Sequence, residues 1–262
     1  MAKQRKHEEE REEARDIDTL PKPPTDLMAS NLNPAAQAFL QELEGDRQVP
    51  KGIPLISIDH QEGVFVLPSG EIVREIAGYP IYYFQTRRYY ERPPMPGSKG
   101  QPPDCWSGDL EFPSREAKKV QNAMCSGCPQ AEWGTARDGR GQACSTQTWV
   151  FLLNPQFGNP PIGVIVFPPS SIRRLLGTRT QPGYFGQAGA RHGAYEIVWS
   201  VFALERQSGQ VPFCIVDPIM GEAVSDIETA RVLSRVRNDF RSMMDALRGQ
   251  PTEVPISTEE SE

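Results

Sequence analysis

Hydrophobic and polar residues alternate over most of the middle of the chain, a pattern that is typical of strands with one buried face. In the second half of the chain, helical spacing occurs in a short segment, 168–176, and in residues 226–247, where Leu233 and Phe240 share one face. Residues 177–193 are rich in glycine and are predicted to form a loop. The pattern therefore predicts a mainly β protein with a few helices. The predicted strands cover residues 53–58, 63–67, 71–76, 79–90, 146–153, 162–167, 194–206 and 211–217.

Both ends of the chain have compositions that are typical of disorder. Residues 1–30 are rich in charge and proline, and residues 249–262 contain four acidic residues and no basic one. A short helix is predicted within residues 31–50, because an asparagine followed by a proline suits a helix start. The predicted organisation is a disordered arm, a short helix, a folded domain over residues 51–220, an amphipathic helix over residues 221–248 and an acidic disordered tail.

The predicted strand 79–90 carries five tyrosines, one phenylalanine and two arginines. Alternation places Tyr79, Tyr83, Arg87 and Tyr89 on one face of this strand. Aromatic rings stack on unpaired bases, at roughly 1–3 kcal/mol per base, while arginines contact the phosphates. We therefore expect these four residues to contact a nucleic-acid strand. Tyrosine is also a common strand residue that half-buries, and for each ring taken singly the sequence favours this structural role.

Four of the five cysteines have the spacing of a zinc site: Cys105, Cys125, Cys128 and Cys144. The Cys-x-x-Cys pair lets two sulfurs reach one ion from a tight turn, and the flanking cysteines complete a tetrahedron. One structural Zn²⁺ per chain is predicted, with no open position for catalysis. A redox pair and a disulfide are the alternatives. Cys214 is predicted to be an ordinary apolar strand residue.

Charge is distributed unevenly along the chain. Residues 74–191 contain 14 Lys and Arg against 8 Asp and Glu, a net charge of +6, so a chain total of −6 leaves −12 for the rest. A basic middle favours a polyanionic partner, although a chance asymmetry produces the same count. The turn 133–141 presents Arg137 and Arg140, which either contact phosphate or pair with nearby acids. With no long apolar run and no secretory signal, the chain is predicted to be cytoplasmic, without a membrane partner.

The strand order, the aromatic strand, the four cysteines and the acidic tail together resemble the zinc-containing single-stranded DNA-binding proteins of tailed-bacteriophage replication systems. The resemblance covers about residues 50–218 and the tail, and it implies a five-stranded OB-like barrel. It implies that a zinc loop, residues 100–146, forms one wall of a groove for single-stranded DNA and that Trp106 joins the contacts. It also implies that the tail recruits DNA replication, recombination and repair proteins, in the host cytoplasm if the chain is phage-encoded. In the best-known phage example a histidine is one zinc ligand, whereas this chain offers four cysteines.

The sequence leaves two rivals to DNA binding. The chain has three histidines and lacks a P-loop, a His-Glu-x-x-His or a Gly-x-Ser-x-Gly motif, so no enzymatic activity is predicted. The other rival is a zinc-containing protein-interaction module of a replication or transcription complex. The predicted function is that of a non-catalytic single-stranded DNA-binding protein.

Overall fold

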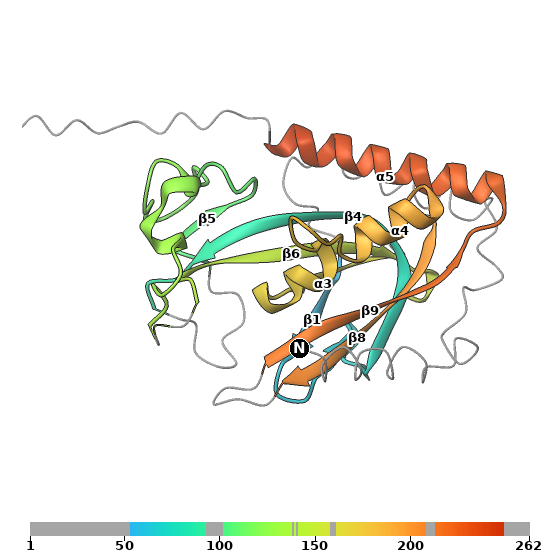
Figure 1. Cartoon of the computed structure of the whole chain (residues 1–262), viewed down its shortest axis with the longest axis horizontal. Coiled ribbons are helices and arrows are strands. Elements are labelled where there is room, and N and C mark those ends of the chain that lie inside the picture. Colours follow the sequence, from blue (N-terminus) through green and yellow to red (C-terminus); the bar gives the residue numbers. More distant parts are fainter. Residues whose placement is uncertain are drawn as a thin grey trace, which may run out of the picture.

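One curled sheet forms the body of the protein, as Figure 1 shows. The computed structural model describes residues 53–92, 102–137, 139, 141–157, 161–207 and 213–248. No helix within this part of the chain is long and apolar enough to cross a membrane. The strands are β1 (Leu55–Asp59), β2 (Val64–Val66), β3 (Ile72–Val73), β4 (Glu75–Tyr89), β5 (Cys105–Ser107), β6 (Cys144–Leu153), β7 (Ile162–Phe167), β8 (Val198–Gln207) and β9 (Phe213–Ala223).

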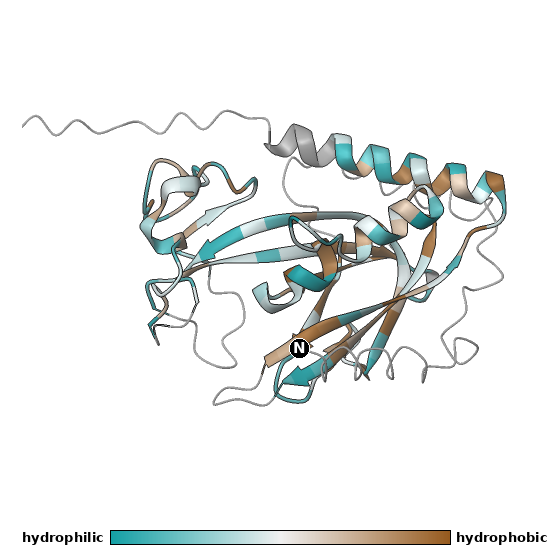
Figure 2. Cartoon of the chain, in the orientation of Figure 1, coloured by the Kyte–Doolittle hydropathy of each residue, from teal (hydrophilic) through white to brown (hydrophobic). Residues whose placement is uncertain are grey.

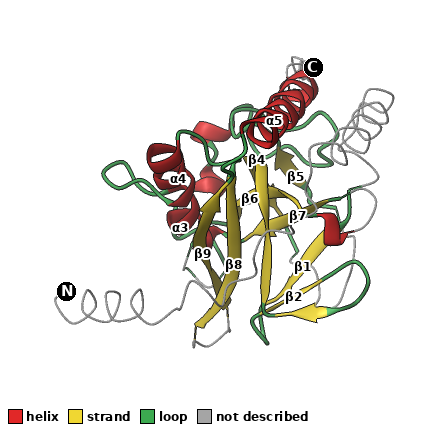
Figure 3. Ribbon diagram, turned by 90° about the vertical axis from the view of Figure 1, so that its right-hand side faces the viewer, coloured by secondary structure: helices red, strands yellow, loops and turns green. Residues whose placement is uncertain are grey.

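Helices cover both faces of the sheet, with α3 and α4 on one side and α5 on the other (Figure 3). Asp226 caps the start of α5, because its Oδ2 accepts hydrogen bonds from the amide and the hydroxyl of Thr229 at 2.8 and 2.7 Å. The α-helices are α3 (Ile172–Leu176), α4 (Tyr184–His192) and α5 (Ile227–Arg248), and the 3₁₀ turns are η2 (Cys125–Gly127), η3 (Pro129–Ala131), η4 (Pro155–Phe157) and η5 (Pro169–Ser171).

Strand β4 is the centre of the sheet, whose order is β3-β2-β1-β7-β6-β4-β8-β9. One edge of β4 pairs with β6 from residue 79 to residue 89. The other edge pairs first with β8, over residues 75–78, and then with the three-residue strand β5, over residues 87–89. β1 runs parallel to β7, and the other pairings are antiparallel. The residues between β4 and β6, called here the cysteine lobe (102–143), therefore attach to the far end of β4.

A bulge in β4 changes which side chains share a face. The register with β6 shifts between Pro80 and Tyr82, and a bulge adds one residue to the strand and bends it. As a result Tyr79 and Tyr82 both enter the core beneath α5, although strict alternation places them on opposite faces. Gly78 permits the close approach of β4 to β6, because a Cβ there would lie 3.0 Å from the carbonyl oxygen of Leu153.

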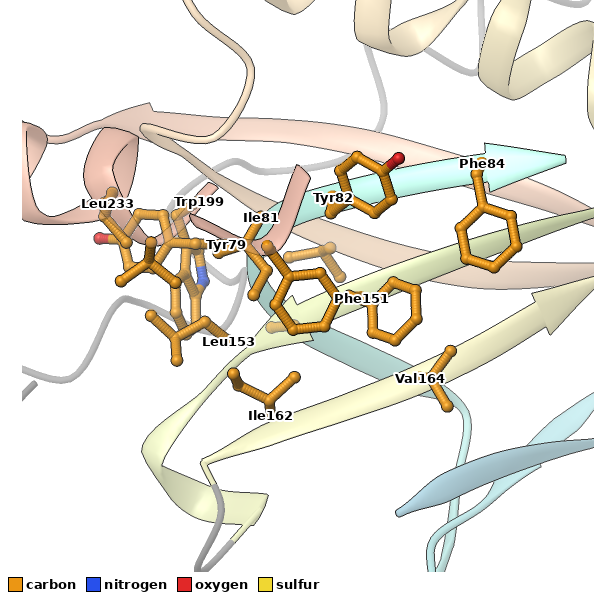
Figure 4. Close-up of a cluster of buried hydrophobic side chains, with 14 residues drawn as sticks. Tyr79, Ile81, Tyr82, Phe84, Phe151, Leu153, Ile162, Val164, Trp199 and Leu233 are labelled. Atoms are coloured by element: carbon orange, nitrogen blue, oxygen red, sulfur yellow. The ribbon is translucent and has the colours of Figure 1, made fainter. Parts of the chain in front are cut away.

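Two hydrophobic cores lie on opposite faces of the sheet. The core beneath α5 includes Tyr82 and Phe151, which Figure 4 labels. Phe240 of the helix packs on both rings, with its ring centroid 5.9 Å from that of Tyr82 and 4.7 Å from that of Phe151. The other core lies between the sheet and α3 and α4, and it includes Phe185. Figure 2 shows mainly hydrophobic residues in the strands of the body, whereas α5 carries both kinds. Burial on both faces explains why alternation is interrupted in β6 and β7, where residues 150–153 and 162–165 are buried in succession.

The protein is mainly β with a few helices, as predicted. Most predicted strands overlap observed ones, and the predicted helix 226–247 corresponds to α5, although β9 extends to Ala223 within the range 221–248 that was assigned to the helix. β5 was not predicted, β4 runs unbroken from Glu75 to Tyr89 where two strands were expected, and β8 begins at Val198 instead of residue 194. The predicted loop 177–193 was wrong in part, because it contains α4. Tyr184, Phe185 and Ala188 of α4 are buried on one face, and this tertiary packing outweighs the low helix propensity of the two glycines that the helix contains.

A closed five-stranded barrel is not confirmed. The sheet has nine strands in the described ranges, and β7 pairs with β1 on the edge away from β6. The arm and short helix predicted within residues 1–50 and the acidic tail of residues 249–262 lie outside the described residues.

Candidate functional site

Four buried thiols line one small cavity at the end of the sheet. Cys105, Cys125, Cys128 and Cys144 are each less than 9% exposed, and all four are free thiols. The cavity has a volume of about 10 Å³ and is also lined by Arg87. That volume corresponds to roughly one water-sized sphere. The cysteines that sequence spacing grouped together therefore lie around space for a single ion.

Strand pairing places two of the four thiols. Tyr89 of β4 is opposite Cys105 on one side and opposite Cys144 on the other. Residues directly opposite each other in a sheet point to the same face, so these two cysteines share a face across the middle strand. The β5 burial pattern agrees, because Cys105 and Ser107 are buried while Trp106 between them is half-buried.

The other two thiols come from the Cys-x-x-Cys turn. η2 forms one 3₁₀ turn from Cys125, and the amide of Cys128 donates to the Cys125 carbonyl at 3.4 Å. Asn122 supports this turn, because its Nδ2 donates to the carbonyl oxygens of Met124 and Gly127 at 3.2 and 2.9 Å. The Cys125 amide donates to the Glu111 carbonyl at 2.8 Å, which ties the turn to the rest of the lobe. The turn is thus held in place by hydrogen bonds that do not involve sulfur.

Four thiols are ligands that Zn²⁺ prefers, but their side chains are not arranged around a metal position in the structure. In the part of the chain that the structure describes, no group of three or more His, Cys, Asp or Glu side chains is arranged so that it could hold a metal ion. Cys105 and Cys144 lie on the two strands that flank β4, so strand spacing puts their backbones at about 10 Å. Zinc–sulfur bonds of about 2.3 Å require the thiols to close inward. The convergence of four buried thiols on one cavity is the observation that favours a metal.

Burial raises the pKa of Cys105, Cys125 and Cys144, the last to about 12. Neighbouring thiols of the cluster raise the pKa of Cys144 further, while the guanidinium of Arg87 opposes this rise. Thiols with raised pKa values are poor nucleophiles, which argues against the redox alternative. A bound dication would offset the cost of ionising them, and binding would release protons.

The structure separates the residues that were predicted to contact nucleic acid. Tyr79 is 4% exposed and packs edge-on against Trp199, with centroids 5.0 Å apart, so its ring belongs to the core. The ring of Tyr83 stacks on Phe185 of α4, with centroids 4.1 Å apart and planes 10° apart. α4, which sequence patterning missed, therefore occupies the ring face that a base would need.

The remaining predicted contacts lie around the cysteine lobe. Arg87 points into the thiol cavity, and its Nη1 donates to the Cys125 carbonyl. Tyr89 is half-buried on the same face of β4 as the thiols. Arg137 is exposed, and its Nη2 donates to the carbonyl oxygen of Glu91 at 2.8 Å. Arg140 lies outside the described residues.

An aromatic–arginine surface lies on the opposite face of the same strands, and it consists of Trp106, Arg88 and Trp149. Trp106 of β5 is opposite Arg88 of β4, so both point away from the thiols. The Arg88 Cζ lies 5.0 Å from the ring centroid of Trp149 on β6, within cation–π range. All three side chains are half-buried.

Sheet contacts hold Trp149 in position. Its ring stacks on Phe84 with centroids 5.7 Å apart, and its Nε1 donates to Thr86 Oγ1 at 3.0 Å. Sequence analysis included Trp106 but missed Arg88 and Trp149. Strand alternation could have identified Arg88, because it places this residue on the face of the strand opposite Arg87. Only the strand pairing brings Trp149 beside it.

Comparison with protein-family models, curated proteins and solved structures gives no match for this chain. The resemblance to zinc-containing single-stranded DNA-binding proteins therefore stays a prediction, and function is argued from the site.

Proposed function

We propose that this chain is a non-catalytic single-stranded DNA-binding protein of DNA replication, recombination and repair. The observation that carries the proposal is the aromatic–arginine surface, in which Arg88 lies between Trp106 and Trp149 on three adjacent strands. Trp106 is the proposed stacking platform for an unpaired base, and the guanidinium of Arg88 offers positive charge to the phosphates. The ring of Trp149 already stacks on Phe84 and lies beside Arg88, so it positions the arginine. A sheet surface of this composition suits a strand whose bases are not paired.

The charge distribution supports an anionic ligand. Residues 74–191, which include β4, the cysteine lobe and β6, have the net charge of +6 derived above from 14 basic and 8 acidic residues. Phosphate contacts from such a region make binding depend steeply on salt.

The strand order supports an OB-like reading of the central sheet. β4 pairs with both β6 and β8, β6 pairs with β7, β8 pairs with β9, and α3 and α4 fall between β7 and β8. An OB barrel has this succession, with a helix between its third and fourth strands. β1, β2 and β3 would then be an addition at the β7 edge.

In the proposed protein one structural Zn²⁺ is held by Cys105, Cys125, Cys128 and Cys144. Four thiolates leave the ion no open position, so it supplies stability and no chemistry. Its effect on binding is positional, because Cys105 and Trp106 are neighbours on β5 and face opposite sides of the sheet. Holding Cys105 therefore holds Trp106 in the aromatic–arginine surface. The acidic residues 249–262 are proposed to recruit partner proteins in the cytoplasm.

Fluorescence anisotropy with a labelled oligothymidine, at several salt concentrations, tests the proposal. Trp106→Ala should weaken binding by roughly 1–3 kcal/mol, about 5- to 150-fold, because one stacking platform is lost. Arg88→Ala should weaken binding and reduce its salt dependence. Trp133→Ala is the matched control, since Trp133 is 81% exposed in the same lobe but lies outside the surface. Equal binding of single-stranded and duplex DNA, or loss of binding only in the Trp133 variant, would contradict the proposal.

A protein-interaction module is the second candidate, and one observation favours it. Four large apolar side chains of the cysteine lobe are exposed: Phe112 at 43%, Val120 at 38%, Met124 at 50% and Trp133 at 81%. Exposed apolar side chains of this size occur at protein-binding sites. Under this alternative the salt titration would detect no single-stranded DNA binding. Substitution of the four exposed apolar residues would instead weaken binding to a partner protein.

A further inference from the structure

We propose that Arg87 is the counter-ion of the thiolate centre and a positioning residue for its ligands, with no direct contact to nucleic acid. This inference rests on the zinc centre proposed above. Zn²⁺ held by four thiolates carries a net negative charge, and such a charge in a buried site requires a compensating cation. Arg87 is placed to supply that cation.

Strand register puts Arg87 beneath the four thiols. It pairs with Ser107 of β5 and Thr146 of β6, each two residues along its strand from a cysteine of the cluster. Side chains two residues apart on a strand share a face, so Arg87 faces the same side as Cys105 and Cys144. Its side chain lines the cavity that all four cysteines line.

The guanidinium of Arg87 has donor capacity that the described protein groups leave unused. Nη1 donates to the Cys125 carbonyl, which fixes the guanidinium against the Cys-x-x-Cys turn. Nε is buried and has no hydrogen-bond partner in the structure. Within the described ranges no carboxylate forms an ion pair with Arg87, whereas Lys119, Arg174, Arg231 and Arg237 each have at least one carboxylate partner.

A buried N–H group without a partner is unfavourable, and so is a positive charge without a counter-ion. Negative sulfur ligands would relieve both at once, since the guanidinium keeps several donors in a fixed plane. The thiolates in turn gain a fixed positive charge beside them. Metal binding and the burial of Arg87 are therefore expected to stabilise each other.

The neighbouring residue provides a natural contrast. Arg88 follows Arg87 on β4, but it points to the opposite face and lies against Trp149. Adjacent arginines thus have separate roles, one toward the thiolate centre and one toward the aromatic–arginine surface. Arg87 was predicted from alternation to contact phosphate, and this placement assigns that contact to Arg88.

The test measures the metal affinity of the full-length reduced protein. Co²⁺ is titrated in competition with a chelator while the thiolate-to-cobalt charge-transfer absorption is monitored, and Zn²⁺ is then added to displace the cobalt. Arg87→Met removes the charge and keeps much of the apolar stem, so metal affinity should fall about 10- to 100-fold, as for other residues that support metal ligands. Arg87→Lys keeps the charge and should recover most of that loss. Arg88→Met is the matched control and should bind metal like the wild type. Arg87→Gln replaces Arg87→Met if the latter does not fold by circular dichroism.

Each outcome decides the matter. An Arg87→Met or Arg87→Gln protein with wild-type metal affinity would overturn the role of Arg87, and so would an Arg87→Lys protein as weak as the uncharged variants. A wild type without thiolate-to-cobalt absorption would overturn the zinc centre itself. A metal-loaded Arg87→Met protein that keeps the wild-type salt dependence of oligothymidine binding would support the separation of the two arginines, whereas a reduced salt dependence would refute it.

Discussion

The ion pair between Glu196 and Arg237 links α5 to the sheet. Its removal is expected to lower the free energy of unfolding. Arg237 Nη1 lies 3.0 Å from Glu196 Oε1, and the side chain of Glu196 is 1% exposed while that of Arg237 is 27% exposed. Ser234 of the same helix donates to Oε1 at 3.2 Å, and Oε2 is buried without a hydrogen-bond partner in the structure. The carboxylate therefore depends on Arg237 for its charge compensation.

Removal of the arginine should cost more than the pair itself contributes. At 3.0 Å and an effective dielectric constant of about 20, the attraction is roughly 5 kcal/mol, and desolvation of the two groups offsets much of it. Arg237→Met leaves the buried carboxylate unpaired, so the free energy of unfolding should fall by about 3–5 kcal/mol. Glu196→Gln leaves a neutral amide that still accepts a hydrogen bond, and it should cost about 1–3 kcal/mol.

Urea unfolding followed by circular dichroism and tryptophan fluorescence measures these differences. The double variant Glu196→Gln/Arg237→Met should be more stable than the sum of the single losses implies, because it contains no unpaired charge. Arg235→Met is the control, since Arg235 is an exposed residue of the same helix. A loss below about 1 kcal/mol in Arg237→Met, or strict additivity in the double variant, would refute this account of the pair.

Two further predictions concern the metal and the acidic tail. Cys125→Ser and Cys128→Ser should each lose the single zinc of the reduced protein and lower its melting temperature. Cys214→Ser is the control, because it alters a buried residue of β9 outside the cluster, and metal analysis should find wild-type zinc content. Absence of zinc from the wild type would contradict this prediction. Deleting residues 249–262, which contain four acids and no base, should raise DNA affinity at low salt, with the difference shrinking as ions screen the charges. Unchanged affinity at every salt concentration would reject this competition, and a pull-down with the isolated tail tests partner recruitment separately.

Local sequence patterns determined which segments form strands and helices. Alternation located β4, β6 and β7, and apolar residues at helical spacing located α5, because these signals depend only on which neighbours a residue has along the chain. The four cysteines that spacing grouped as a zinc site line one cavity, and the zinc itself stays a prediction. α4 was missed because its local sequence contains two glycines, and the helix is stabilised by tertiary packing that local patterns do not show.

Only the tertiary structure decided which side of each strand is available for binding. A two-residue period says which side chains share a face, but not what covers that face, and a bulge reverses the pattern within a strand. The bulge beside Pro80 puts Tyr79 in the core beneath α5, and the packing of Phe185 covers one face of the Tyr83 ring. Pairing of β5 and β6 with β4 places Arg87 among the thiols and Arg88 beside Trp149. These contacts join segments that are distant in sequence, so no local pattern contains them.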